Sequence, residues 1–140
     1  LGAQQLPPGW VAQVVEIEER EGAIKVARVV CAAEPGTVLD PKIFEAQMMS
    51  GIVFGLSAAI KQQISFADGV VEQSNYHDHD ALRMIECPQI EIALLENSPF
   101  LGGAGEPGTP PVAPALANAI FALTGKRYRR LPLSTDLSFV

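Results

Sequence analysis

One short segment of this sequence combines a single carboxylate with a high density of glycine. Residues 102–108 read Gly-Gly-Ala-Gly-Glu-Pro-Gly, so four of the seven are glycine and Glu106 is the one charged side chain. Glycine lets a backbone approach a ligand closely and leaves its N–H groups exposed. A carboxylate held ionised beside such a loop suits a general base that acts at a bound cofactor. A flexible loop with a solvated glutamate fits the same residues, because glycine-rich loops are weak motifs by themselves.

A helix is predicted directly after this loop, and its amino end would lie close to Glu106. Thr109 is a candidate N-cap, Pro110-Pro111 opens the helix, and Gly125 ends it. Its apolar residues recur at helical spacing: Val112, Leu116, Ile120 and Leu123. The positive end of a helix dipole favours an ionised carboxylate and a bound anion. This helix would therefore support the base chemistry of Glu106.

A second, buried helix is predicted over residues 41–60. Asp40 is a candidate N-cap, and Pro41 suits the first helical position. The segment is apolar nearly all round, which indicates a helix covered on most sides. Gly51 and Gly55 lie one turn apart, and each would weaken the helix by about 1 kcal/mol relative to alanine. Such glycines indicate a close approach by another backbone or by a ligand.

The remaining patterns predict strands separated by turns and loops. The predicted strands are 10–18, 23–33, 61–66, 70–73, 89–95 and 128–133. Turns at 19–22 and 67–69 join the first and second pairs as hairpins. Polar or Gly/Pro-rich loops are expected at 74–84 and 96–111. The predicted fold class is α+β, with several antiparallel strands or hairpins and two main helices.

The charge of the chain argues against a nucleic-acid partner. The 140 residues carry a formal net charge of −6, and the sequence pI is about 4.8. The one dense basic run, Lys126–Arg130, is short, and an acidic chain with a single short run lacks the footprint of a nucleic-acid-binding domain. We interpret the run as a solvated strand edge or a contact with another subunit.

Metal ligation within the chain finds little support in residue spacing. Cys31 and Cys87 lie far apart in apolar surroundings and form no CxxC pair. Both are therefore expected to be buried free thiols, and neither zinc nor an iron–sulfur cluster is expected here. His77 and His79 offer an alternative, because alternate residues of a strand face one way and the two imidazoles could share a metal. The simpler interpretation is a polar loop at a subunit or domain contact.

Three motifs together resemble one known family. The first is Gly-Gly-Ala-Gly-Glu-Pro at 102–107, followed by Pro-Pro-Val-Ala-Pro-Ala-Leu-Ala-Asn-Ala at 110–119. The second runs along the predicted buried helix and comprises Asp40-Pro41, Gln47, Gly51 and Gly55-Leu56-Ser57-Ala58-Ala59. The third is Asn75-Tyr76-His77-Asp78 with Leu82-Arg83-Met84. The joint pattern resembles the C-terminal part of the molybdopterin-binding large subunit of the xanthine dehydrogenase/aldehyde oxidase family. Within that family the motifs resemble in particular those of isoquinoline 1-oxidoreductase β subunits.

The resemblance assigns chemical roles to these residues. It implies that Glu106 is the catalytic base beside molybdenum and that Gln47 contacts the pterin part of the cofactor. The loop residues Gly103, Ala104 and Gly105 would border the cofactor. The implied reaction is hydroxylation of an N-heteroaromatic compound or an aldehyde, with water as the oxygen donor. The implied cofactor is molybdopterin cytosine dinucleotide, with [2Fe-2S] clusters on a separate small subunit.

The resemblance also implies that residues 1–140 are a single C-terminal fragment of a molybdopterin-binding domain, with a lead-in at 1–9 and a tail at 134–140. Its implied partners are the rest of the molybdenum subunit, the small [2Fe-2S] subunit and a small-molecule substrate. By itself the fragment is expected to bind no cofactor and to be inactive. The rival hypothesis is a non-catalytic folding or association module that forms a homodimer through exposed apolar faces. Both a cytoplasmic and a periplasmic bacterial location remain open.

Overall fold

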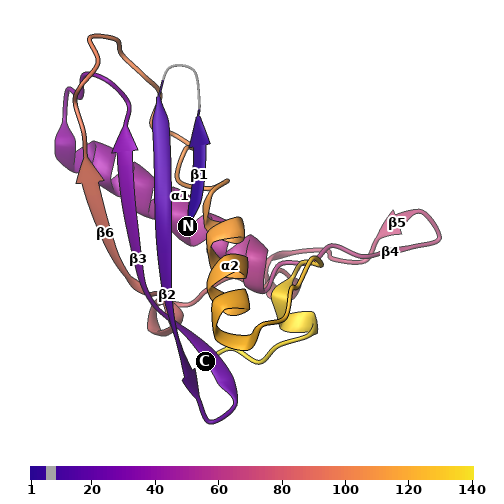
Figure 1. The fold of residues 1–140 in the computed structure, drawn as a ribbon. Helices are drawn as coiled ribbons and strands as arrows, with labels where there is room; N and C mark the ends of the chain where they lie inside the picture. Colours follow the sequence, from indigo (N-terminus) through magenta and orange to yellow (C-terminus); the bar gives the residue numbers. More distant parts are fainter. Residues whose placement is uncertain (6–8) are drawn as a thin grey trace.

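A four-stranded sheet with two helices packed against one face forms the body of the protein (Figure 1). The structure is a computed structural model, and it describes residues 1–5 and 9–140. The sheet contains β1 (Gly2–Gln5), β2 (Trp10–Arg20), β3 (Ala23–Glu34) and β6 (Gln89–Leu94), in that spatial order. The helices are α1 (Pro41–Ile60) and α2 (Val112–Thr124). The prediction of an α+β fold with two main helices is confirmed.

The long hairpin β2–β3 follows from an alternating pattern and a two-residue turn. Val11 and Val15 face the helices and are buried, whereas the side chain of Val14 lies on the opposite, open face. Glu21 and Gly22 form the turn with φ values of 52° and 81°. Positive φ at both central residues matches the right-handed twist of the two strands. The hairpin predicted at 10–18 and 23–33 is therefore confirmed, with each strand slightly longer.

Strand β6 runs parallel to β3, with Arg28 opposite Gln89 and Ala33 opposite Leu94. Strand patterns alone did not distinguish this arrangement from an antiparallel one. A parallel return needs a long crossover. Helix α1 and the segment after it supply that crossover, and they bring the chain back to the edge of β3.

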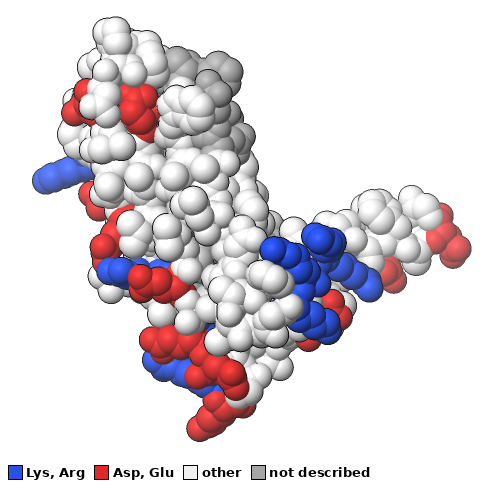
Figure 2. All heavy atoms as spheres, in the orientation of Figure 1, with Lys and Arg blue, Asp and Glu red and all other residues white. Residues whose placement is uncertain are grey.

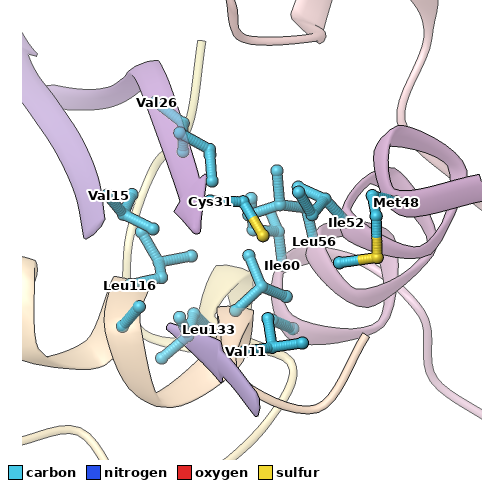
Figure 3. Packing of buried hydrophobic residues seen from close by; sticks show 14 of the residues in the cluster. Val11, Val15, Val26, Cys31, Met48, Ile52, Leu56, Ile60, Leu116 and Leu133 are labelled. Atoms are coloured by element: carbon cyan, nitrogen blue, oxygen red, sulfur yellow. The ribbon is translucent and has the colours of Figure 1, made fainter. Parts of the chain in front are cut away.

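The core lies between the inner face of the sheet and the two helices (Figure 3). Met48, Ile52 and Leu56 of α1 are fully buried, and Leu116 of α2 is buried in the same cluster. By length and composition α1 could cross a membrane, but half of its most apolar 18-residue stretch is buried inside this fold. The cap of α1 is as predicted, since Asp40 Oδ1 accepts hydrogen bonds from two backbone N–H groups of the first turn.

Both ends of the chain are part of the fold rather than appendages. The lead-in predicted at residues 1–9 contains β1, which pairs with β2 from Gly2 opposite Gln13 onward; residues 6–8 lie outside the described part. The tail predicted at 134–140 begins within a 3-10 turn, Leu133–Thr135. It then pairs with Ile24, whose N–H donates to Ser138 O at 2.8 Å and whose carbonyl accepts from Val140 N at 3.0 Å. Backbone groups of β3 left without a neighbouring strand explain this docking.

The strand predicted at 128–133 is wrong. Among the described residues, no strand begins between Arg127 and the 3-10 turn at Leu133–Thr135. Pro132 has no N–H to donate to a neighbouring strand, so the apolar residues of this segment do not pair as a β-strand. The basic run Lys126–Arg130 is consequently not a strand edge. Its charged side chains are exposed beside the end of α2, where Figure 2 shows a group of blue side chains.

The hairpin predicted around residues 67–69 is present but much shorter than expected. It consists of β4 (Phe66–Ala67) and β5 (Val70–Val71), and it projects away from the body (Figure 1). The segment that returns from it contains two 3-10 turns, Tyr76–Asp78 and Met84–Glu86. The projecting position explains the short strands, because a two-stranded ribbon without a packed face has little to stabilise it.

Candidate functional site

The glycine-rich loop lies along one face of α1, and three glycines make this contact possible. A Cβ at Gly55 would lie 2.5 Å from Val112 Cγ1 and 2.7 Å from Thr109 O. A Cβ at Gly108 would lie 2.7 Å from Met48 O, and one at Gly51 would lie 3.3 Å from Gly108 Cα. Any side chain at Gly55 or Gly108 would force the two segments apart. The predicted close approach at Gly51 and Gly55 is therefore confirmed, and the partner is the loop backbone.

Thr109 fixes the end of the loop to α1, which differs from its predicted role as a helix cap. Its Oγ1 donates to Gly51 O at 3.0 Å, and its N–H donates to Glu106 O at 3.0 Å. Helix α2 begins only at Val112, with Pro111 as the N-cap residue and no side-chain cap. The hydroxyl is engaged elsewhere because the paired glycines bring the α1 backbone within its reach. Gly125 ends α2 with a φ of 70°, as predicted.

Glu106 is exposed at the bend between the loop and α2. It borders an open groove of about 340 Å³ together with Ser50, Gly51 and Phe54 of α1. The turn from Glu106 to Thr109 is closed by a backbone hydrogen bond, so the backbone at Glu106 is held in place. The carboxylate is therefore fixed at its base and free at its tip, which suits a group that must reach a bound reactant.

Gln47 lies one helical turn before Gly51 on the same face of α1. Its side chain is exposed and borders a neighbouring groove of about 430 Å³ that Ala104 and Gly102 also line. The fold thus places the loop over α1 so that Ala104 shares a groove with Gln47 and Glu106 occupies the next one. Residues more than fifty positions apart in sequence meet along a single helix face.

Gly103 and Gly105 differ from the glycines that contact α1. None of the described atoms lies within 4 Å of a Cβ built at either residue, and neither has the positive φ that disfavours other residues. Neither backbone conformation nor packing against the described residues therefore requires glycine at these two positions. A group that approaches the loop from outside the chain would account for both. The loop consequently fits a cofactor that lies against its backbone.

Gln13 of β2 contributes to the site and was not predicted. It is completely buried, and its Nε2 donates to Gly108 O at 2.8 Å across 95 positions of sequence. Its Oε1 has no partner among the described atoms. The sequence contains a sign of this role, because Gln13 is a polar residue on the inward, apolar side of a strand between Val11 and Val15. Its partner could not be found without the fold.

The two cysteines differ, and only one matches its prediction. Cys31 is buried beside Gln13, whose Nε2 lies 3.8 Å from the sulfur. Burial raises the pKa of the Cys31 thiol to about 11, and the Gln13 hydrogen bond opposes this only in part. The thiol is therefore protonated and unreactive near neutral pH. Cys87 is exposed, so its predicted burial is wrong; it follows a 3-10 turn at the rim of an open groove.

The segment with His77 and His79 is organised by hydrogen bonds to the Asp78 carboxylate. Asp78 accepts backbone hydrogen bonds from Ser74 at 2.8 Å and Asn75 at 2.9 Å, and these lower the pKa of the Asp78 carboxyl. Within residues 1–5 and 9–140, no three His, Cys, Asp or Glu side chains are grouped as metal ligands would be. This segment is a capped turn that stands apart from the glycine-rich loop.

Comparison with known proteins places the chain in a cofactor-binding class. Residues 2–88 match the family model described as "Molybdopterin cofactor-binding domain". The chain is 39% identical over 124 residues to the β subunit of isoquinoline 1-oxidoreductase from Brevundimonas diminuta, covering 89% of this chain and 16% of that protein. It is 33% identical to a nicotinate dehydrogenase subunit from Pseudomonas putida, covering 91% and 11%. The chain belongs to the molybdopterin cofactor-binding domain family, and the resemblance inferred from its motifs is confirmed.

Solved structures agree with this assignment. The aldehyde oxidoreductase from Desulfovibrio desulfuricans matches with a TM-score of 0.72 and 26% identity, covering 89% of this chain and 14% of that chain. Quinoline 2-oxidoreductase from Pseudomonas putida 86 matches with a TM-score of 0.74 at 23% identity, covering 89% and 17%, which shows the shared fold. The chain therefore spans about a sixth or less of the length of the relatives it matches.

Proposed function

We propose that this chain forms one wall of the active site of a molybdenum hydroxylase and that Glu106 is its general base. The substrate would be an N-heteroaromatic compound or an aldehyde, and water would donate the oxygen atom. The observation that carries the proposal is the position of Glu106, which is fixed at its backbone, exposed at its carboxylate and adjacent to Gly105. Gly105 has open space in front of it in a chain of the molybdopterin cofactor-binding family.

In this proposal the residues of the loop and of α1 have different roles, in proton transfer and in contact with the cofactor. Glu106 takes a proton at its carboxylate oxygen when the oxygen nucleophile attacks the substrate carbon. The Gln47 amide offers two donors and an acceptor, which suits the hydrogen-bonding edge of a pterin. Gly103, Ala104 and Gly105 let the loop backbone lie against the cofactor. The cofactor itself supplies the two-electron oxidation when it is bound.

Electron transfer in this proposal takes place on another polypeptide. The cofactor form would be molybdopterin cytosine dinucleotide, and [2Fe-2S] clusters would lie on a separate small subunit. Within this chain the two cysteines cannot hold one cluster together, because Cys31 is buried in the core and Cys87 lies on the surface. The rest of the molybdenum subunit would complete the cofactor site.

A second candidate role is a folding or association module without catalytic function. The observation that favours it is the exposure of large apolar side chains on and before α1, with Leu39 87%, Ile43 64% and Phe54 62% exposed. Such a surface suits contact with another chain. In that role the glycine-rich loop would be a linker, and the carboxylate of Glu106 would be dispensable.

The isolated 140-residue chain is expected to bind no molybdopterin and to have no hydroxylase activity. Glu106 and Gln47 border open grooves rather than an enclosed cavity, so a bound cofactor would remain largely solvated. Equilibrium dialysis with extracted molybdopterin cofactor measures this directly. Tight binding at one cofactor per chain would contradict the expectation.

Replacement of Glu106 by glutamine in the full-length, assembled enzyme separates the two candidate roles. The amide keeps the size of the side chain but cannot accept a proton as a base, so turnover should fall by about 100-fold or more. Molybdenum content should be unchanged. The matched control is Glu72→Gln, since Glu72 lies on the projecting hairpin and is exposed. Unchanged turnover in Glu106→Gln would favour the association module.

A further inference from the structure

The buried contact between Gln13 and Gly108 connects the sheet to the glycine-rich loop. Gln13 lies on the inward side of β2, completely buried, and donates from Nε2 to Gly108 O at 2.8 Å. Gly108 follows Glu106 by two residues. A buried hydrogen bond between segments 95 residues apart constrains the loop more strongly than a surface contact, because water cannot readily replace it.

The other contacts of the loop show what this hydrogen bond controls. Thr109 is held by Gly51 O, and its N–H closes the turn onto Glu106 O. Gly102 N donates to Pro35 O at 2.8 Å at the opposite end of the loop. Between these anchors, Gly108 is pressed against the α1 backbone on one side and held by Gln13 on the other. Gln13 is therefore the contact from the sheet among those that hold the turn carrying Glu106.

The unpartnered oxygen of Gln13 supports a specific role for its amide. Its Oε1 is buried without a partner among the described atoms, which costs free energy that an apolar side chain of similar length would avoid. If residue 13 only filled space in the core, an apolar side chain of similar length would stabilise the fold more than glutamine does. The amide orientation is fixed by Gly108 O, which can only accept a hydrogen bond. Donation from Nε2, to Gly108 O at 2.8 Å and to the Cys31 sulfur at the longer distance of 3.8 Å, thus distinguishes glutamine from an apolar side chain in the core.

We propose that Gln13 is a positioning residue that aims the Glu106 carboxylate by holding the Gly108 carbonyl. This inference rests on the proposed base role of Glu106. Gln13 lies in the core behind the loop and would act on Glu106 through the backbone at Gly108. It should therefore affect the rate of the chemical step and leave the affinity for substrate largely unchanged.

Two variants of the full-length enzyme test the donation. Gln13→Met fills the same space without a donor and should lower kcat roughly tenfold with KM unchanged, the effect expected for the loss of one buried hydrogen bond. Gln13→Glu restores a donor only when the new carboxyl is protonated. Because burial raises the pKa of a carboxyl, the kcat of this variant should approach that of wild type measured at the same low pH. The ratio of its kcat to that of wild type should then fall as the pH rises through that raised pKa.

Hydrogen exchange of the enzyme without its cofactor gives a second readout that is independent of turnover. In Gln13→Met the amide of Thr109, which closes the turn onto Glu106 O, should exchange roughly tenfold faster, as expected for a lost buried hydrogen bond. The amides of β3 should be unchanged. The control is Val15→Ala, which alters another buried side chain on the inner face of β2 but leaves the hydrogen bond from Gln13 to Gly108 O in place. It should leave exchange in the loop unaltered.

The outcomes distinguish this inference from the proposed function. Equal kcat and equal pH profiles for wild type, Gln13→Met and Gln13→Glu would overturn the positioning role, as would loop exchange that changes equally in Val15→Ala. If Glu106→Gln abolishes turnover while Gln13→Met does not lower it, only the positioning role fails. If Glu106→Gln retains turnover, the base role fails, and the hydrogen-exchange result alone then reports whether Gln13 holds the loop.

Discussion

Gly105 and Gly108 belong to the same loop, but their missing side chains have different surroundings. A Cβ at Gly108 would lie 2.7 Å from Met48 O and 3.3 Å from Ile52 N, so the α1 backbone requires glycine there. A Cβ at Gly105 would meet none of the described atoms within 4 Å. The first glycine is explained by its contact with α1, whereas the second has open space in front of it, as the proposed cofactor contact would need.

Substitution should therefore affect the stability of the fold at Gly108 and the cofactor content of the enzyme at Gly105. Gly108→Ala should lower the free energy of unfolding by about 1–3 kcal/mol, because the new methyl group forces two backbones apart. Gly105→Val should change it by less than about 0.5 kcal/mol, as for an unconstrained surface position, but should reduce the molybdenum and pterin content of the assembled enzyme. Urea unfolding and cofactor analysis measure the two effects. A full cofactor content in Gly105→Val would contradict the site.

At the level of elements, the end of α1 is joined to the returning segment by an ion pair. Lys61 Nζ lies 2.6 Å from Glu86 Oε1, and the N–H of Arg83 donates to the other Glu86 oxygen at 2.7 Å. The hydrogen bond from Lys61, followed by that from Arg83, lowers the pKa of the Glu86 carboxyl. This contact fixes the base of the projecting hairpin to the body.

The lowered pKa of Glu86 gives the stability of the fold a defined pH dependence. A depressed carboxyl pKa stabilises the folded state above the unfolded pKa, whose ordinary value is 4.5, and this stabilisation is lost as the pH falls through the folded pKa. The urea midpoint should therefore drop between about pH 5 and pH 3, and Glu86→Gln should show a smaller drop. Glu72→Gln serves as the control. An identical drop in wild type and Glu86→Gln would contradict this assignment.

Elements whose stability is local were predicted well from the sequence. The cap at Asp40, the turn at Glu21-Gly22 and the end of α2 at Gly125 each depend on neighbouring residues, and each is where the pattern placed it. The parallel direction of β6 and the pairing of the chain ends depend on distant neighbours. Thr109 shows the same limit, because its hydroxyl bonds to Gly51 instead of capping α2.

The candidate site likewise contains residues that the sequence identified and one residue whose contact depends on the fold. Glu106 and Gln47 were identified by residue type, motif and family resemblance, and the fold places both along one face of α1. Their roles as base and pterin contact stay predictions. Gln13 was missed because its hydrogen-bond partner lies 95 residues away in the sequence. A polar residue in an apolar strand pattern does not indicate which group it contacts.

At the scale of the whole molecule, large apolar side chains are exposed on the projecting hairpin and on α1. The sheet and helices bury a shared core, while apolar side chains of the projecting hairpin remain exposed, with Phe66 67% and Val70 68% exposed. Ile43 and Phe54 add exposed apolar surface on α1. In the proposed enzyme the remainder of the molybdenum subunit would cover these side chains.

The isolated chain is therefore expected to self-associate. Contact between exposed apolar surfaces removes them from water, which favours a dimer at sufficient concentration. Sedimentation velocity should show a mass above 14.9 kDa that rises with concentration. Phe66→Ser together with Val70→Thr should reduce it, while Glu72→Gln should not. A monomer at every concentration would contradict this expectation.

The central claim is that Glu106 acts as a base in the chemical step, and the single-turnover reduction of the enzyme by its substrate tests it most directly. This rate excludes product release and re-oxidation, and it is measured by stopped-flow absorbance of the assembled enzyme. The account predicts that Glu106→Gln slows it by about 100-fold or more while molybdenum and pterin contents match wild type. A rate equal to that of wild type at equal cofactor content would contradict the account.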